Sequence, residues 1–180
     1  MTAFDQSFKD LIEVEGGYSD DARDLGGKTN WGITEAVARN NDYTGDMKDL
    51  RKDEAKRIYK SQYWDIQRLD DVADLSGAVA HELFDTGVNM GVKRAGEFLQ
   101  RSLNALNNGG RLYPDLEVDG MIGPASVAAL RKYIGARGSE GITILMRALN
   151  CLQGARYIEL AEAREQNEAF LYGWLRTRVQ

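Results

Sequence analysis

Apolar residues recur at helical spacing over most of the chain, and the first such run has clear ends. It predicts an amphipathic helix over residues ~3–15, because its apolar positions fall at i, i+4, i+7 and i+8 and form one buried stripe. This stripe consists of Phe4, Phe8, Leu11 and Ile12. Gly16-Gly17 ends the helix, since glycine adopts the left-handed conformation of a helix end without steric cost.

Helical periodicity returns after residue 34 and continues to the end of the chain. Ser76 is a suitable N-cap for a central helix, and Pro124 suits the first turn of a later one. Asparagine and glycine at 107–111 interrupt the pattern, so the best internal boundary lies near residues 90–111. The predicted helices cover residues ~35–41, Asp49–Trp64, Asp74–Asn89, Val92–Asn107, a segment from Pro124, Ser139–Arg164 and Glu165–Val179.

Residues 16–34 differ from the rest, because they are rich in glycine and aspartate and have little helical periodicity. Gly26-Gly27 is a turn signal between two polar strand candidates. We therefore predict a mainly α fold, a helical bundle with one small β-hairpin or loop excursion after the first helix.

Composition agrees with a globular helical protein. A length of 180 residues suits one domain, or one domain with a small appendage, and 43% of the residues are hydrophobic. The single cysteine, Cys151, excludes an intramolecular disulfide framework. No apolar run approaches the ~18 residues of a membrane span. The first residues lack the basic and apolar regions of a secretory signal, so we expect synthesis in the cytoplasm without a signal peptide.

Charge and ligating residues argue against several function classes. The net charge is −5 and no basic face is evident, so we expect no nucleic-acid partner. The only histidine, His81, has no second histidine or cysteine nearby, which makes a zinc site improbable. The aspartates after Gly17 lack the order of a calcium-binding EF-hand loop. We expect neither a metal nor an organic cofactor.

Candidate chemistry concentrates between Glu15 and Thr34. Glu15 ends the first helix, where the negative end of the macrodipole and any desolvation would raise the pKa of its carboxyl group, as a general acid requires. Asp24 and Thr29 follow on a segment that a tight excursion would fold back over Glu15. Two carboxyl groups across a cleft can hydrolyse a glycosidic bond, and a hydroxyl beside the second can help to hold a water. An ordinary solvated turn is the alternative.

Several motifs of the chain resemble one enzyme family. The order Glu15-Gly-Gly-Tyr18, then Asp-x-x-Asp24-x-Gly-Gly-x-Thr29-x-x-Gly-Ile-Thr34, resembles the signature of the phage-type N-acetylmuramidases of glycoside hydrolase family 108. The wider phage lysozyme pattern has five residues between the aspartate and the threonine, and this chain has four. The resemblance continues at Tyr63-Trp64, at Phe84-Asp85-x-x-Val-Asn89-x-Gly91 and at Val118-Asp-Gly-x-Ile-Gly-Pro124. The last element also resembles peptidoglycan-binding modules.

The resemblance implies a lysozyme-like α+β fold and cleavage of the β-1,4 bond between N-acetylmuramic acid and N-acetylglucosamine. Glu15 would be the general acid, and Asp24 with Thr29 would position the water. The family includes phage endolysins and bacterial relatives that open the wall for toxin release, so the role would be cell lysis or protein export. The alternative is a non-catalytic cell-wall-binding module in which Glu15 only ends a helix.

Further residues are expected to contact the glycan, because aromatic rings stack on pyranose faces and polar groups border the groove in the resembling family. They are Tyr18, Asn30, Trp31, Tyr63, Trp64, Asp85 and Asn89. Positions in the core are the alternative for the aromatic residues Trp31, Tyr63 and Trp64. A solvated polar helix face is the alternative for Asp85 and Asn89.

The resemblance divides the chain in two. Residues 1–90 would form the catalytic muramidase region, and residues 91–180 a helical peptidoglycan-binding-like region packed on the first as one compact unit. We expect a monomer whose partner is peptidoglycan, without a membrane partner. The enzyme would act in the periplasm or cell wall after release by another factor.

Overall fold

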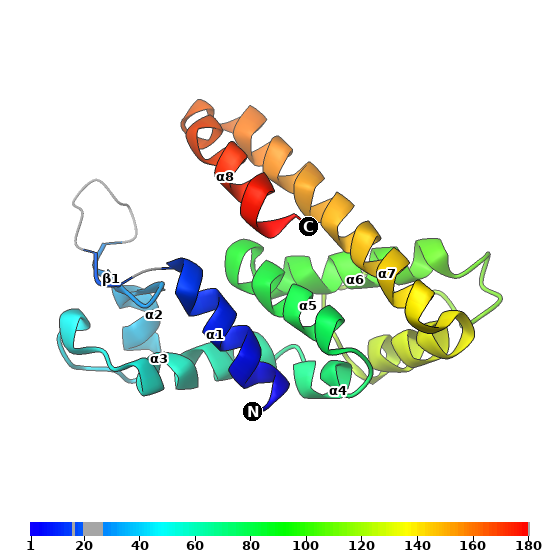
Figure 1. Ribbon diagram of the computed structural model, residues 1–180, viewed down its shortest axis with the longest axis horizontal. Helices are drawn as coiled ribbons and strands as arrows, with labels where there is room; N and C mark the ends of the chain where they lie inside the picture. Colours follow the sequence, from blue (N-terminus) through cyan, green and yellow to red (C-terminus); the bar gives the residue numbers. More distant parts are fainter. Residues whose placement is uncertain (16, 20–26, 180) are drawn as a thin grey trace. The chain divides into compact units, whose positions relative to one another are not determined.

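The computed structural model describes residues 1–15, 17–19 and 27–179, with residues 14 and 15 described by their backbone alone. The chain forms two compact units, Met1–Ile66 and Gln67–Gln180 (Figure 1). Both are built mainly from helices, and a small antiparallel hairpin follows the first helix. The predicted fold class is thus confirmed.

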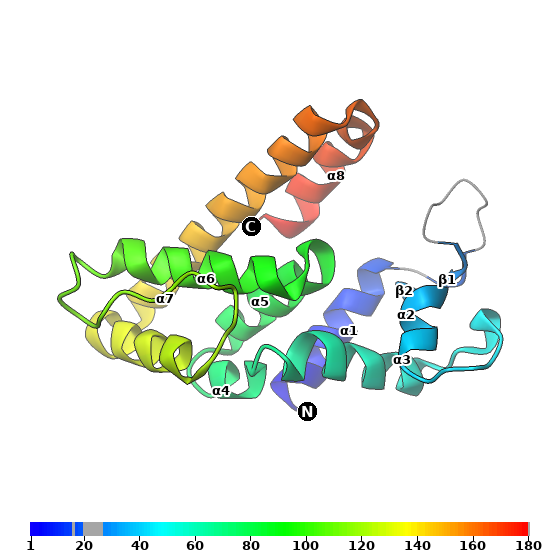
Figure 2. The ribbon, with the colours of Figure 1, turned by 180° about the vertical axis from the view of Figure 1, so that it is seen from behind.

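In the first unit a short helix directly follows the hairpin and lies beside it (Figure 2). The Thr34 side chain caps the helix after the hairpin by accepting a hydrogen bond from the backbone N–H of Val37. The elements are α1 (Ala3–Glu15), β1 (Thr29–Asn30), β2 (Ile33–Thr34), α2 (Glu35–Asn40), the 3-10 helix η1 (Met47–Asp49), α3 (Lys52–Tyr59) and the π-helix η2 (Lys60–Asp65).

The turn of the β1–β2 hairpin is Trp31-Gly32. The predicted turn at Gly26-Gly27 stays a prediction, because Gly26 lies outside the described residues. A two-residue hairpin turn of type I′ requires positive φ at both central residues, and φ is 54° at Trp31 and 73° at Gly32. This conformation is unfavourable for a bulky side chain. Two hydrogen bonds hold it: Trp31 Nε1 donates to the Leu50 carbonyl at 2.8 Å, and the Tyr59 hydroxyl donates to the Trp31 carbonyl at 3.1 Å.

An aromatic cluster joins α1 to α3 and the π-helix. The Phe8 ring lies 5.7 Å from the Tyr59 ring, and the Phe4 ring meets the edge of Trp64 at 5.3 Å. Tyr63 extends the cluster at 5.5 Å from Tyr59. Because Tyr59 also binds the hairpin turn, this packing fixes the direction of α1 relative to the hairpin.

The second unit is a helical assembly in which α5 and α6 run side by side (Figures 1 and 2). Ser76 caps α5 as predicted, by accepting a hydrogen bond from the Val79 backbone N–H. None of the described helices is long and apolar enough to cross a membrane. The elements are α4 (Leu69–Ala73), α5 (Gly77–Met90), α6 (Val92–Leu106), α7 (Pro124–Ala163), the 3-10 helix η3 (Glu165–Asn167) and α8 (Glu168–Arg178).

Three amide side chains, two on α6 and one on the residue directly after it, bind the extended segment that follows this helix. Gln100 accepts from the Gly120 N–H and donates to the Asp119 carboxylate, at 2.8 and 2.7 Å. Asn104 makes two 2.8 Å hydrogen bonds to the backbone of Leu116. Asn107 donates to the Tyr113 carbonyl at 2.6 Å. These bonds satisfy backbone groups that would otherwise be buried without partners.

Helix α7 changes direction at Gly138, whose φ of 61° and ψ of −152° are not helical. The predicted start of a new helix at Ser139 coincides with this kink. Beyond it, α7 and α8 form a hairpin whose aromatic rings stack, with Tyr157 and Phe170 at 5.1 and 6.0 Å from Trp174. Arg178 at the end of α8 donates to the Asp85 carboxylate of α5 at 2.6 Å.

A buried carboxyl group lies in the core of the second unit. Glu82 of α5 is only 8% exposed and accepts a hydrogen bond from the Thr86 hydroxyl at 3.4 Å. That hydroxyl in turn accepts from Gln153 of α7 at 3.1 Å. Desolvation, with a smaller contribution from the charge of Asp85, raises the pKa of Glu82 to about 7.

We predict that Gly96→Ala destabilises the second unit. An added Cβ would lie 2.1 Å from the Gly120 carbonyl oxygen, which is backbone and cannot move aside as a side chain can. Overpacking of this kind costs about 1–3 kcal/mol, measurable by denaturant unfolding. Gly173→Ala in α8 is the control, because a Cβ there meets no described atom within 4 Å. Equal stability of the two variants would contradict the close approach of α6 to the Gly120 turn.

A second prediction concerns pH. Because the folded pKa of Glu82 lies above its unfolded value, its contribution to stability is present below about pH 4 and is lost as pH rises through about 7. Glu82→Gln should therefore be more stable than the wild type at pH 8, by up to about 3 kcal/mol, and no more stable at pH 4. Denaturant unfolding at both pH values, with the exposed Glu162→Gln as control, measures the difference. A difference independent of pH would contradict the raised pKa.

Candidate active site

The candidate site is built where α1 ends and the hairpin begins. Glu15 is the last residue of α1, and the last turn of this helix carries no basic residue. The helix therefore presents the negative end of its macrodipole at this position, where a protonated carboxyl group is favoured over a carboxylate. The Glu15 side chain lies outside the described part of the structure.

Backbone pairing places Thr29 close to this helix end. Ser19 and Thr29 form an antiparallel bridge with N–H to carbonyl hydrogen bonds of 2.8 and 2.9 Å. Ser19 follows Glu15 by four residues, so chain length holds it within roughly 14 Å of Glu15. Thr29 also pairs with Thr34 on its other side. Glu15 and Thr29, two of the three predicted catalytic residues, thus belong to one small region of the first unit.

The Thr29 hydroxyl has a defined orientation, because it donates to the Gly27 carbonyl at 3.3 Å. A hydroxyl has one proton and two acceptor lone pairs, so the oxygen remains able to accept a hydrogen bond from a water. Asp24 precedes Thr29 in the sequence between the paired residues Ser19 and Thr29, and it lies outside the described residues.

Two of the predicted glycan contacts on the hairpin have structural partners. Asn30 is 5% exposed, and its side-chain amide donates to the Met47 carbonyl at 2.7 Å, which fastens the hairpin to η1. Trp31 is partly exposed, and the Lys52 ammonium lies 5.8 Å from its ring centroid. Asn30 therefore acts as a support of the hairpin, whereas Trp31 keeps ring surface in contact with solvent.

The other predicted aromatic contacts of the first unit divide by burial. Tyr18 is 43% exposed, beside the end of α1. Tyr63 is partly buried, and desolvation raises the pKa of its hydroxyl. Trp64 is 0% exposed and packs on Phe4, so its ring has no free face for a sugar. For Trp64 the structure shows the alternative, a core position.

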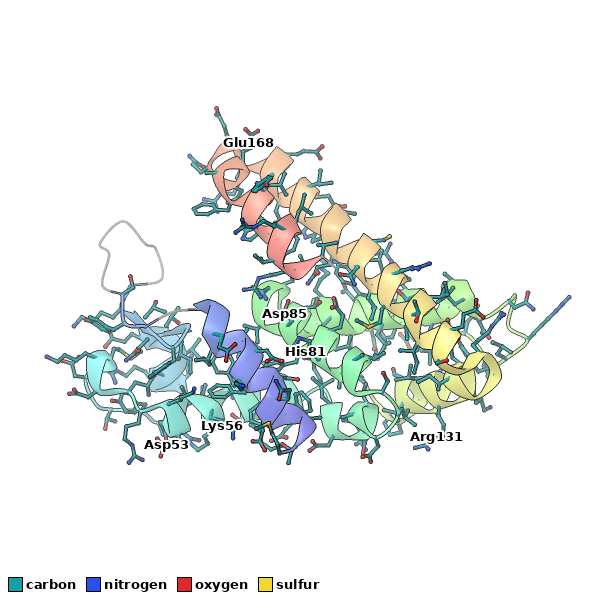
Figure 3. The ribbon with its side chains drawn as sticks, in the orientation of Figure 1. Asp53, Lys56, His81, Asp85, Arg131 and Glu168 are labelled. Carbon is teal, nitrogen blue, oxygen red and sulfur yellow. The ribbon has the colours of Figure 1, made fainter. Side chains whose placement is uncertain are left out.

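Asp85 and Asn89 lie on α5 in the second unit, with Asp85 labelled in Figure 3. The Asn89 amide donates to the Asp85 carbonyl at 2.8 Å, and Asn89 is exposed. The Asp85 carboxylate is paired with Arg178, and the two side chains are only 20% and 11% exposed. Their shared face also holds the buried Glu82, three residues before Asp85.

Sequence reasoning missed Glu82 and Arg178. Glu82 lies three positions after Val79 and one before Leu83, two apolar residues at helical spacing, so its position could have indicated partial burial. Nothing in the sequence indicates the pairing of Arg178 with Asp85, because 93 residues separate them. Among the described residues, no group of three His, Cys, Asp or Glu side chains is arranged to hold a metal ion.

Comparison with known proteins relates both halves of the chain to cell-wall proteins. Residues 8–91 match the family described as glycosyl hydrolase 108, and residues 94–179 match one described as a predicted peptidoglycan domain. A search of curated proteins found no match.

The chain is also similar to a solved structure, that of Brucella abortus SagA. The two share 25% sequence identity with a TM-score of 0.61, over 98% of each chain. Together with the order of Glu15, Asp24 and Thr29, these matches show that residues 8–91 are a glycosyl hydrolase 108 region, which a predicted peptidoglycan domain follows at residues 94–179.

Proposed function

We propose that this protein is an N-acetylmuramidase that hydrolyses the β-1,4 bond between N-acetylmuramic acid and N-acetylglucosamine in peptidoglycan. The observation that carries the proposal is the Ser19–Thr29 pairing next to the end of α1, inside the segment that matches a glycoside hydrolase family. A wall-binding module without activity has no need of Glu15, Asp24 and Thr29 in this order.

Glu15 is the proposed general acid. Its place at the negative end of α1 favours the protonated carboxyl group, which can give its proton to the leaving glycosidic oxygen. Departure of the leaving sugar produces an oxocarbenium-like state that needs a nearby carboxylate and an attacking water.

We propose that Asp24 is the nearby carboxylate and that Thr29 helps to hold the attacking water. The Thr29 proton is directed to the Gly27 carbonyl, which leaves the hydroxyl oxygen as an acceptor for a water. Asp24 would accept the second hydrogen of that water and draw off its proton as it attacks the sugar. The support for this arrangement is the backbone ladder that fixes Thr29 on both sides.

Glycan contacts are proposed for the exposed rings near the site. Tyr18 and Trp31 have accessible surface, and an aromatic face complements the apolar C–H face of a pyranose. Tyr63, Asn30 and Trp64 would act indirectly, by holding the hairpin and α1 in place.

We further propose that residues 1–90 are the catalytic region and that residues 91–180 bind the wall. Asn89 of α5, which is exposed, would contact the glycan, whereas the Asp85 carboxylate is engaged by Arg178. The activity would serve cell lysis or the opening of the wall during protein export, with the enzyme acting in the periplasm or wall after release by another factor.

Glu15→Gln is expected to abolish cleavage without unfolding the protein. Glutamine keeps the shape of the side chain but cannot donate a carboxylic proton, and loss of such a group lowers the rate roughly 10²–10⁴-fold. Release of reducing ends from purified walls measures the rate, and circular dichroism checks folding. Glu13→Gln is the matched control, because Glu13 is an exposed residue on the same helix. Near-normal turnover by Glu15→Gln would remove Glu15 from the mechanism, and an inactive wild type that still binds walls would favour the binding module.

The aspartates at positions 20, 21 and 24 should differ in effect. Asp24→Asn is expected to reduce turnover far more than Asp20→Asn or Asp21→Asn, because only Asp24 is nine positions after Glu15 and five before Thr29. The same reducing-end assay compares all three with the wild type. Similar losses in the three variants would instead indicate that all three aspartates support the folding of this segment.

A further inference from the structure

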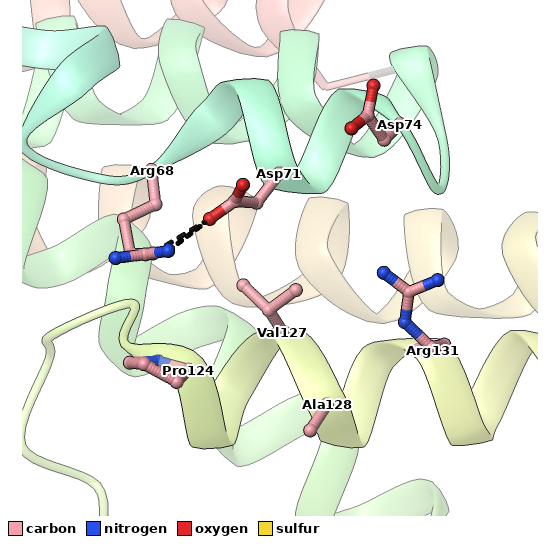
Figure 4. A pocket seen from close by; sticks show the side chains of 7 residues that line it. All are labelled: Arg68, Asp71, Asp74, Pro124, Val127, Ala128 and Arg131. Atoms are coloured by element: carbon pink, nitrogen blue, oxygen red, sulfur yellow. Dashed lines mark hydrogen bonds and ion pairs between the residues drawn. The ribbon is translucent and has the colours of Figure 1, made fainter.

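A cleft in the second unit is lined by none of the candidate site residues named above. It is formed by α4 and by the first turns of α7, and its volume is about 300 Å³ (Figure 4). The apolar floor includes Pro124 and Val127, and charged side chains stand at both ends.

The two ends of the cleft differ in how their charges are satisfied. At one end Arg68 and Asp71 bind each other, with the Arg68 Nε donating to the Asp71 carboxylate at 2.8 Å. At the other end, Asp74 at the C-terminus of α4 and Arg131 of α7 face the same space and form no hydrogen bond or ion pair with each other (Figure 4). Neither makes a side-chain hydrogen bond or ion pair with any residue that the structure describes.

This arrangement selects a class of ligand. The lining arginines and aspartates cancel in charge, so the cleft offers no attraction to a polyanion or a polycation. A zwitterion fits it better: an ammonium group can donate to Asp74 while a carboxylate accepts a two-pronged hydrogen bond from Arg131. The floor at Pro124 and Val127 suits an aliphatic chain leading to that charged end.

The walls of the cleft are held in place by the core. Leu69 and Val72 anchor α4 and are both 0% exposed. The first turn of α7 is fixed from α6, because Gln100 binds Asp119 and the Met121 carbonyl just before it. The backbone that carries Asp74 and Arg131 therefore loses little conformational freedom when a ligand binds.

We propose that this cleft binds the free amino and carboxylate end of a diamino acid in the stem peptide of peptidoglycan. The inference rests on the proposed function, since it takes peptidoglycan as the substrate. The stem peptide branches from the same sugar whose glycosidic bond the enzyme would cleave. A site for it in the second unit would let the protein select strands by their peptides, separately from the hydrolytic step.

The test is a binding measurement on the full chain. The probe is an N-acetylated stem tetrapeptide with meso-diaminopimelate at its third position, titrated calorimetrically. Asp74→Asn and Arg131→Gln should each weaken binding about tenfold, the size of one lost charge-assisted hydrogen bond. The tetrapeptide with lysine in place of diaminopimelate lacks the side-chain carboxylate and should bind about tenfold more weakly to the wild type.

Glu117→Gln and Lys132→Gln are the matched controls, because they remove the same charges from a separate cavity of this unit. Both should bind the probe like the wild type. No binding of the probe, equal binding of the two peptides, or unchanged binding by Asp74→Asn and Arg131→Gln would each overturn the proposal. Hydrolysis of peptide-free glycan strands is measured in parallel and should be unaffected by these variants. If the wild type binds the probe but does not cleave those strands, the muramidase proposal is refuted and the proposed ligand of the cleft is still supported.

Discussion

The hydrogen bond from the Tyr59 hydroxyl to the Trp31 carbonyl is the contact on which the candidate active site depends. It stabilises a hairpin turn that a tryptophan would otherwise resist, since φ is positive at Trp31. The same Tyr59 ring packs on Phe8 of α1. One fully buried side chain therefore contacts both the helix that ends at Glu15 and the hairpin that begins at Thr29. It fixes the position of the hairpin relative to the helix. A hydroxyl and a carboxyl group can cooperate in catalysis only if their supports are held this rigidly.

In the second unit, side-chain hydrogen bonds hold an extended backbone segment in place. Its chain runs from α6 to α7 through a segment without helix or strand, whose backbone groups need partners. Gln100, Asn104 and Asn107 provide them from α6 and the residue directly after it, because residues four and seven positions apart point the same way. The glycines at 96 and 120 then allow the two backbones to approach. The Asp-Gly-x-Ile-Gly-Pro element is thus a turn that side-chain amides hold. This turn places Pro124 at the start of α7.

Periodicity and capping predicted most helices closely, because those signals are local. The helix over residues ~3–15, the N-cap at Ser76 and the first-turn position of Pro124 depend on neighbours in the sequence. What the sequence could not predict depends on distant contacts. The hairpin turn falls at Trp31-Gly32 since Tyr59 and Leu50 supply hydrogen bonds there. The predicted helix Asp49–Trp64 begins later, at Lys52, and becomes a π-helix at Lys60, and the short α4 has too few residues for a periodic signal.

Burial decides what the charged residues of the second unit can do. The Asp85–Arg178 pair is largely removed from water, and separating such a pair leaves an uncompensated charge at a cost of about 3–5 kcal/mol. A substrate therefore gains little by recruiting the Asp85 carboxylate, and the pair instead ties α8 to α5. The α7–α8 hairpin needs that tie, since none of the described residues of α8 is buried. Asp74 and Arg131 stand in the opposite situation: both are exposed, so a ligand can satisfy them without breaking anything that the fold requires.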